Sequence, residues 1–226
     1  MNHSMPVRIL PVLVAGLLAS AGCGGCTKPA PPVSKAALHQ AATAGDIAAA
    51  EAALAAGINI NALGRSDATP LHLAVQGNQP AMVRFLVSKG AKVDAVDSSD
   101  RTPLHYAAQN GFADVALALL ESGADPNARN AYGFSALAGA AMDGRCEIIT
   151  LLLAHGADVN LTDLAAKTPL HFALKQQRDA AARVLVEAGA DVNAVDREGR
   201  RPLTEAKARG VEAATLELLV SRGARE

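Results

Sequence analysis

Aromatic residues are scarce in this sequence: Trp is absent, and Phe and Tyr together make up 3% of the 226 residues. A single compact domain of this length usually builds its core from large side chains. Here half of the residues are hydrophobic, and Ala is the commonest of them. This composition suits thin helices that pack closely in layers. It predicts a linear, all-helical array without one central core.

An excess of charge of either sign is also missing. The sequence has 22 acidic and 21 basic residues, which gives a formal net charge of −1. Nucleic acids and acidic membrane surfaces attract proteins that carry a strong positive field. We therefore expect no nucleic-acid partner, and we expect bulk charge to play little part in the choice of partner.

Cysteines and catalytic motifs are few. The three cysteines are Cys23, Cys26 and Cys146, too few for a fold that depends on disulfides. The sequence contains no G-x-S-x-G, no Gly-rich phosphate loop and no H-E-x-x-H. We predict that the protein is not an enzyme and that it uses no cofactor, no metal and no small-molecule substrate.

Apolar runs in this sequence are short, and the longest of them lies near the N-terminus. Residues 9–18 follow the single cationic side chain Arg8 and precede a stretch of small residues. The run is too short to span a bilayer comfortably, and its charged, apolar and small-residue parts match a secretory signal. We predict that residues 1–22 are a signal peptide.

The end of this segment resembles a bacterial lipobox. Residues 18–23 read Leu-Ala-Ser-Ala-Gly-Cys, which implies lipidation of Cys23 and a membrane anchor. By resemblance to lipoprotein sorting, Gly24 implies the outer membrane, with the protein facing the periplasm. Residues 23–34 would then form a Gly/Pro-rich tether, extended by its prolines. The alternative uses residues 19–21, Ala-Ser-Ala, as an ordinary cleavage site and leaves a soluble periplasmic protein.

Cys23 and Cys26 also have the C-x-x-C spacing of thiol redox proteins. A redox Cys needs a feature such as a helix N-terminus to lower its pKa, and a Pro-rich stretch follows instead. A redox protein is therefore a third and weaker interpretation.

The rest of the sequence is organised by one repeated motif. Thr-Pro-Leu-His-x-Ala occurs at residues 69–74, 102–107 and 168–173. A weaker copy at residues 135–140 has neither the Pro nor the His, and the outer copies lie at 36–41 and 201–206. Glycines at the same period of 33 residues mark a second position in each unit: Gly57, Gly90, Gly123, Gly156 and Gly189. An internal period of this length predicts a stacked array of repeats.

This motif and its 33-residue unit resemble the ankyrin-repeat family over about residues 35 to 224. The resemblance implies an all-α repeat solenoid of about six stacked helix–turn–helix units with projecting β-turn fingers. The predicted ankyrin-repeat domain spans residues 35–226. Its repeats lie near residues 35–65, 66–98, 99–131, 132–164, 165–197 and 198–226.

Four histidines, His39, His72, His105 and His171, occupy the same motif position. Stacked repeats are spaced about 10 Å apart, which is too far for two such rings to share a metal. The resemblance implies a structural role, in which each ring joins hydrogen bonds to its own turn and to the adjacent repeat. Cys146 is read as a partly buried, inert thiol.

In the family that the sequence resembles, partners lie along the finger tips and the inner face of the first helices. Aromatic residues and Arg are the commonest interface anchors, so Tyr132 and Phe134 are the leading candidates in a chain this poor in aromatics. Phe134 could instead fold onto its own turn. The predicted partner-binding residues on the middle repeats are Arg101, Arg129, Tyr132, Phe134, Met142, Leu164 and Lys167.

The sequence therefore predicts a non-catalytic protein–protein interaction module that is exported and tethered to the cell envelope. A second interpretation is an immunity or inhibitor protein that neutralises an envelope-acting toxin or hydrolase. Both functions need only a complementary surface, so the sequence does not separate them.

Overall fold

A computed structural model describes residues 34–226. The predicted signal peptide, Cys23, Cys26 and the predicted tether up to residue 33 lie outside the described residues. Within residues 34–226, none of the helices combines the length and apolar character needed to cross a bilayer.

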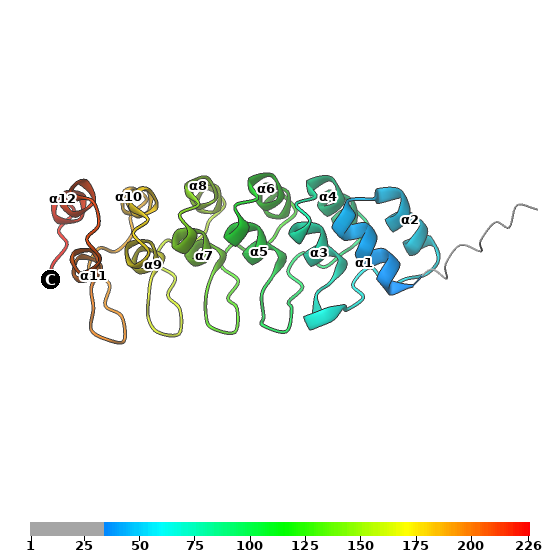
Figure 1. The fold of residues 1–226 in the computed structure, drawn as a ribbon, viewed down its shortest axis with the longest axis horizontal. Helices are drawn as coiled ribbons and strands as arrows, with labels where there is room; N and C mark the ends of the chain where they lie inside the picture. The colour runs from blue at the N-terminus through cyan, green and yellow to red at the C-terminus, as the bar shows by residue number, and fades with distance from the viewer. Residues whose placement is uncertain (1–33) are drawn as a thin grey trace, which may run out of the picture. The chain divides into compact units, whose positions relative to one another are not determined.

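The described residues form twelve α-helices, two in each of six repeats, and one short 3₁₀ helix. Figure 1 shows them as two parallel rows, with a finger extending below each junction. The inner row holds α1 (Lys35–Ala44), α3 (Pro70–Gln76), α5 (Pro103–Asn110), α7 (Ala136–Asp143), α9 (Pro169–Lys175) and α11 (Pro202–Arg209). The outer row holds α2 (Ile47–Ala55), α4 (Pro80–Ser88), α6 (Ala113–Glu121), α8 (Cys146–Ala154), α10 (Asp179–Glu187) and α12 (Ala213–Ser221). The 3₁₀ helix η1 (Arg65–Asp67) lies in the first finger. The predicted all-α solenoid of stacked helix–turn–helix units with projecting fingers is confirmed.

The third repeat shows why these residues fold into helix, helix and finger. Thr102 has extended backbone and caps α5, and Pro103 occupies the first helical position, where a missing N–H costs nothing. Gly111 ends α5 with a φ of 78°, a left-handed conformation that suits glycine. Asp114 lies in the first turn of α6, where the helix dipole favours a carboxylate.

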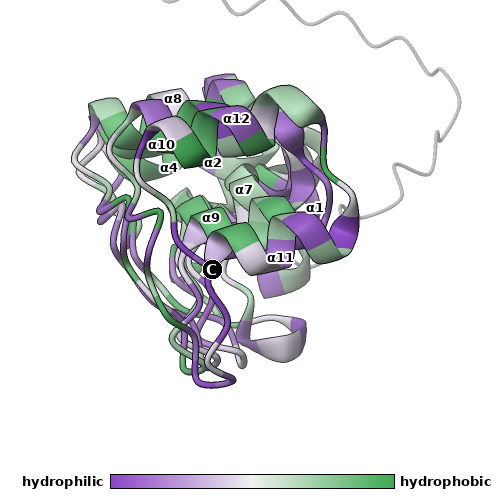
Figure 2. Cartoon of the chain, turned by 90° about the vertical axis from the view of Figure 1, so that its left-hand side faces the viewer, coloured by the Kyte–Doolittle hydropathy of each residue, from purple (hydrophilic) through white to green (hydrophobic). Residues whose placement is uncertain are grey.

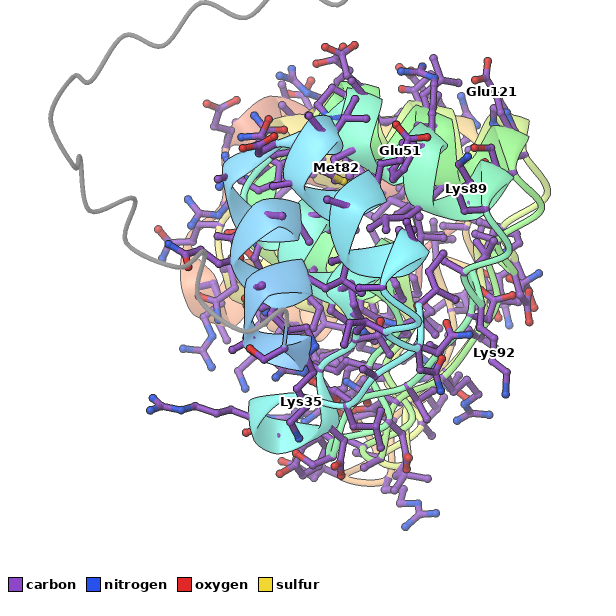
Figure 3. All side chains as sticks on the ribbon, turned by 90° about the vertical axis from the view of Figure 1, so that its right-hand side faces the viewer. Lys35, Glu51, Met82, Lys89, Lys92 and Glu121 are labelled. Carbon is purple, nitrogen blue, oxygen red and sulfur yellow. The ribbon has the colours of Figure 1, made fainter. Side chains whose placement is uncertain are left out.

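The core is a thin layer between the two rows of helices. Leu104, Leu119, Leu137 and Leu152 are almost completely buried there. Met82 is completely buried, and Figure 3 shows it within the array, seen from the N-terminal end. Pairs of fully buried alanines on the inner helices leave room for close packing: Ala107, Ala108, Ala140 and Ala141.

The fingers are joined to one another by single backbone hydrogen bonds. The N–H of Ala131 donates to Ser99 O at 3.1 Å, and that of Leu164 donates to Tyr132 O at 3.2 Å. Figure 2 views the array end-on, from the side of α12, and shows the fingers stacked behind one another beside the helical layers. The fingers and the inner helices therefore present one continuous face.

The fourth repeat departs from the others at the start of α7. Ser135 keeps the extended capping conformation and accepts a hydrogen bond from Ala138 N at 3.2 Å. Ala138, however, replaces the histidine that in the third and fifth repeats links the inner helix to the next finger. Ala136 also replaces the proline that preorganises the first turn.

We therefore expect the fourth repeat to be the least stable internal layer. Backbone amides of residues 137–142 should exchange with solvent faster than those of residues 104–109, because local opening costs less where a preorganised turn and a hydrogen bond are missing. Hydrogen–deuterium exchange with mass spectrometry measures both segments in one experiment. Equal protection of the two segments would contradict this expectation.

Candidate protein-binding surface

Three buried histidines connect neighbouring repeats. In His72, His105 and His171, Nδ1 lies 2.9 Å from Oγ1 of the capping Thr of the same repeat. Nε2 lies 3.0, 2.9 and 3.3 Å, respectively, from a backbone oxygen of the next repeat. In the first repeat, His39 Nε2 instead lies 2.7 Å from Ala62 O, within its own repeat.

The partners of His105 fix its tautomer. Phe134 O can only accept, so Nε2 carries the proton, and Nδ1 then accepts from the Thr102 N–H at 3.1 Å. Burial lowers the pKa of His72, His105 and His171, against the opposing effect of the carbonyl that each Nε2 faces. A proton added at Nδ1 would face the N–H of the capping Thr. These imidazoles are therefore held neutral and placed as structural links.

The stability of the array should decrease as the pH falls below about 6.5, the ordinary pKa of histidine. Because the folded-state pKa of three histidines is lowered, the unfolded chain binds more protons in this range. Stability is then fully present above the unfolded-state pKa and is lost as the pH falls. Thermal unfolding followed by circular dichroism between about pH 7.5 and 5 measures the slope. A Tm that does not change over this range would contradict the prediction.

No group of three or more His, Cys, Asp or Glu side chains within residues 34–226 is arranged to hold a metal ion. Cys146 begins the outer helix α8 as a half-buried free thiol, with Sγ 3.7 Å from Gly144 O.

A hollow of about 300 Å³ lies on the inner face, between α5 and α7 and the fingers that precede them. Four of the seven predicted partner-binding residues line it: Arg101, Tyr132, Phe134 and Met142. The other lining residues are Ser99, His105, Gln109, Asn130, Ser135 and Gly139. The structure therefore brings together one predicted residue of the third repeat and three of the fourth.

Arg101 is held in place on this surface by two groups of its own repeat. Its Nε and Nη2 donate to Asp97 Oδ2 at 3.1 and 2.9 Å. Its Cζ lies 4.4 Å from the centre of the Tyr106 ring, close enough for a cation–π interaction. Tyr106 in turn donates its hydroxyl to Asp97 Oδ2 at 2.6 Å. The guanidinium is therefore preorganised at the edge of the hollow.

Tyr132 and Phe134 have different environments. The side chain of Tyr132 is 68% exposed at its finger tip, as an interface anchor would be. Phe134 is half-buried, and its ring packs at 4.6 Å, between ring centres, against Phe172 of the next repeat. Phe134 thus has a structural contact on one side and faces the hollow on the other.

Arg129, Leu164 and Lys167 do not line the hollow. Arg129 donates to Gly133 O at 3.2 Å and to Thr162 O at 2.7 Å, so it braces its own finger against the next one. Leu164 is 55% exposed at the following finger tip. Lys167 pairs with Glu198 at 3.3 Å. Their roles in binding stay predictions.

Sequence reasoning missed Gly139, which lies in the floor of the hollow. Aligning the repeats with one another would have indicated it, because the position of Gly139 holds Leu73, Tyr106 and Phe172 in other repeats. A large side chain in three repeats and none in the fourth indicates a gap in the surface.

Comparison with known proteins supports the repeat architecture. The family described as "Ankyrin repeats (3 copies)" matches residues 38–130, 99–163 and 137–225. The crystal structure of an ankyrin repeat domain from Acinetobacter baumannii AYE superposes with a TM-score of 0.77 at 31% sequence identity. The match covers 83% of this chain and 98% of that chain. A comparison with curated protein sequences gave no match.

Proposed function

The chain belongs to the ankyrin-repeat family, and from this premise we propose that it binds another protein on the face formed by its fingers and inner helices. The observation that carries the proposal is the hollow between α5 and α7, lined by Arg101, Tyr132, Phe134 and Met142. Aromatic and Arg side chains around a concave site are typical of energetically dominant contacts. The protein would act by presenting this surface, without catalysis.

Capture of partners by the full-length chain from cell-envelope extracts, followed by titration of the captured protein, tests this function. Tyr132→Ala should weaken binding by about 30-fold, the effect of losing a hot spot worth about 2 kcal/mol. Arg129→Ala should weaken it less, because Arg129 acts by bracing the finger that carries Tyr132. Arg84→Gln on the outer helix α4 is the control, since that side chain is 54% exposed and lies on the outer row.

Unchanged affinity in both Tyr132→Ala and Arg129→Ala would remove the middle fingers from the interface. The identity of the captured protein would also separate a scaffold from an inhibitor. A toxin or hydrolase that loses its activity in the complex would indicate the inhibitor.

We further propose that the protein is exported and anchored to the outer membrane through lipidated Cys23. The support is the sequence of residues 1–23 alone, with its charged, apolar and small-residue parts. Two or more acyl chains hold a protein on a membrane almost permanently. Intact mass spectrometry of the membrane fraction should give a mature chain that begins at an acylated Cys23. A mature chain that begins at Gly22 without acyl groups would instead identify a soluble periplasmic protein.

A further inference from the structure

We infer that the hollow above Gly139 receives one aromatic side chain of the protein partner, flanked by carboxylates. The inference rests on the proposed function and specifies the chemistry of the partner. It follows from a comparison of the same position in successive repeats, from the residues that line the hollow, and from the charges on either side of it.

In the third and fifth repeats, the chain fills this position with its own aromatic side chain. The ring of Tyr106 lies edge-on to His72 of the preceding repeat, with 5.8 Å between ring centres, and under the guanidinium of Arg101. The ring of Phe172 lies against Phe134 of the preceding repeat. Aromatic rings at this register therefore bridge two neighbouring repeats.

In the fourth repeat the corresponding space is open. A Cβ built on Gly139 would meet no atom within 4 Å. The lining of the hollow includes His105 and Arg101 from the preceding repeat and Phe134 from the finger of the fourth repeat. His105 and Phe134 are equivalent to His72 and Arg101, which contact Tyr106. Arg101 is equivalent to Phe134, which contacts Phe172. The hollow is thus the volume that an aromatic side chain at residue 139 would occupy.

The walls of the hollow favour an aromatic occupant. The rings of Phe134 and Tyr132 offer offset or edge-on contacts to another ring, and the thioether of Met142 is a favourable neighbour for aromatic groups. Arg101, which is already held by Asp97, can place its guanidinium against a ring without further ordering. A preorganised cation of this kind loses little entropy on binding.

Charges on both sides favour carboxylates beside that aromatic group. Arg101 lies at the edge formed by the third repeat. In the fifth repeat, Lys167 and Lys175 occupy the positions equivalent to Phe134 and Met142. Lys175 forms no ion pair within residues 34–226. Nearby carboxylates include Asp97, which pairs with Arg101, Glu198, which pairs with Lys167, and Asp143 at the end of α7. Lys175 is therefore the cation of this group that has no ion-pair partner among the described residues.

The absence of Trp from this chain provides a direct measurement. The probe is an acetylated peptide, Gly-Glu-Glu-Trp-Glu-Glu-Gly, whose Trp emission is recorded as the full-length chain is added. Entry of the indole into the hollow should shift the emission to shorter wavelength in a saturable way. Peptides with Ala in place of Trp, as competitors, and with Lys in place of Glu test the two parts of the proposed chemistry.

The decisive variant is Gly139→Phe, which would fill the hollow from within. The position is helical and has no positive φ, and Phe172 occupies the equivalent position in α9. The variant should therefore fold, and the loss of a helical Gly should favour folding. Gly139→Leu, which copies Leu73 of the second repeat, is a second filling variant. Gly139→Ala improves the helix in the same way but leaves most of the hollow open, so it is the matched control.

We expect Gly139→Phe and Gly139→Leu to weaken peptide binding by at least about 10-fold and Gly139→Ala by less than about threefold. Lys175→Gln should weaken binding by about threefold, and Arg84→Gln should have no effect.

The inference would be overturned if Gly139→Phe bound the peptide as tightly as the unmodified chain does, or if no saturable signal appeared. It would also be overturned if the Lys-flanked peptide bound as tightly as the Glu-flanked one, or if the Ala peptide competed as well as the Trp peptide. A partner that is captured equally well by Gly139→Phe would overturn this inference and leave the proposed function intact. Failure to capture any partner would count against the proposed function itself.

Discussion

His105→Ala is expected to lower the free energy of unfolding by about 2–4 kcal/mol. The substitution removes the acceptor for the Thr102 N–H and the donor for Phe134 O, both of which hold the third repeat in place. A buried polar group left without its partner costs about 1–3 kcal/mol. The lost ring also leaves a cavity between α5 and the fourth repeat.

His39, which occupies the same motif position in the first repeat, provides a control for this prediction. His39→Ala should cost about 1 kcal/mol, because His39 is only half-buried and its ring contacts Ala62 O within its own repeat. Ala138→His, combined with Ser135→Thr and Ala136→Pro, should stabilise the fourth repeat by restoring the motif. Urea unfolding followed by circular dichroism measures all three changes. If His105→Ala cost no more than His39→Ala, the histidine links would not support the stack as described.

Asp97→Asn is expected to lower the free energy of unfolding by about 2–3 kcal/mol. The Asp97 side chain is 1% exposed and accepts hydrogen bonds from Ser99 N, Arg101 N, the Arg101 guanidinium and Tyr106 Oη. Burial raises the pKa of Asp97, but these hydrogen bonds outweigh burial and hold it at about 2. An amide would present N–H groups to donors and would leave Arg101 without its counter-charge, which is costly for a preorganised ion pair.

The lowered pKa of Asp97 adds a second pH dependence. Its carboxylate stabilises the fold above the ordinary pKa of Asp, about 3.9, and this stabilisation is lost as the pH falls towards 2. Asp196 is the matched control, because it makes the same pair with Arg200 and its pKa is also lowered. In that repeat Glu205 takes the place of the tyrosine and pairs with Arg209 at 2.9 Å. Asp97→Asn should therefore cost more than Asp196→Asn, and equal costs would remove Tyr106 from the account.

The sequence was sufficient to predict the repeat architecture because the motif and its period depend on local chemistry. A capping Thr, a Pro at the first helical position and a Gly at the helix end act within one unit. The period of 33 residues then requires that the units stack. The histidines illustrate the same point, since the motif position that they share predicts hydrogen bonds to the turn of their own repeat.

The shape of the binding surface was harder to predict because it depends on which groups already have partners. Arg101 and Arg129 look alike in the sequence, but Arg101 lines the hollow while Arg129 spans two fingers. Phe134 appears as an exposed aromatic until Phe172 of the next repeat is placed against it. The missing side chain at Gly139 follows from aligning the repeats with one another. That this position opens into a hollow depends on the residues packed around it and follows from the structure alone.

Site-specific photo-cross-linking in living cells tests most directly whether this protein works by presenting its inner face. A photoreactive amino acid replaces Tyr132 at the central finger tip or, in a separate variant, Arg84 on the outer helix α4. We predict a discrete cross-linked protein from position 132 and none from position 84. Cross-links from position 84 alone, or from neither position, would contradict the account.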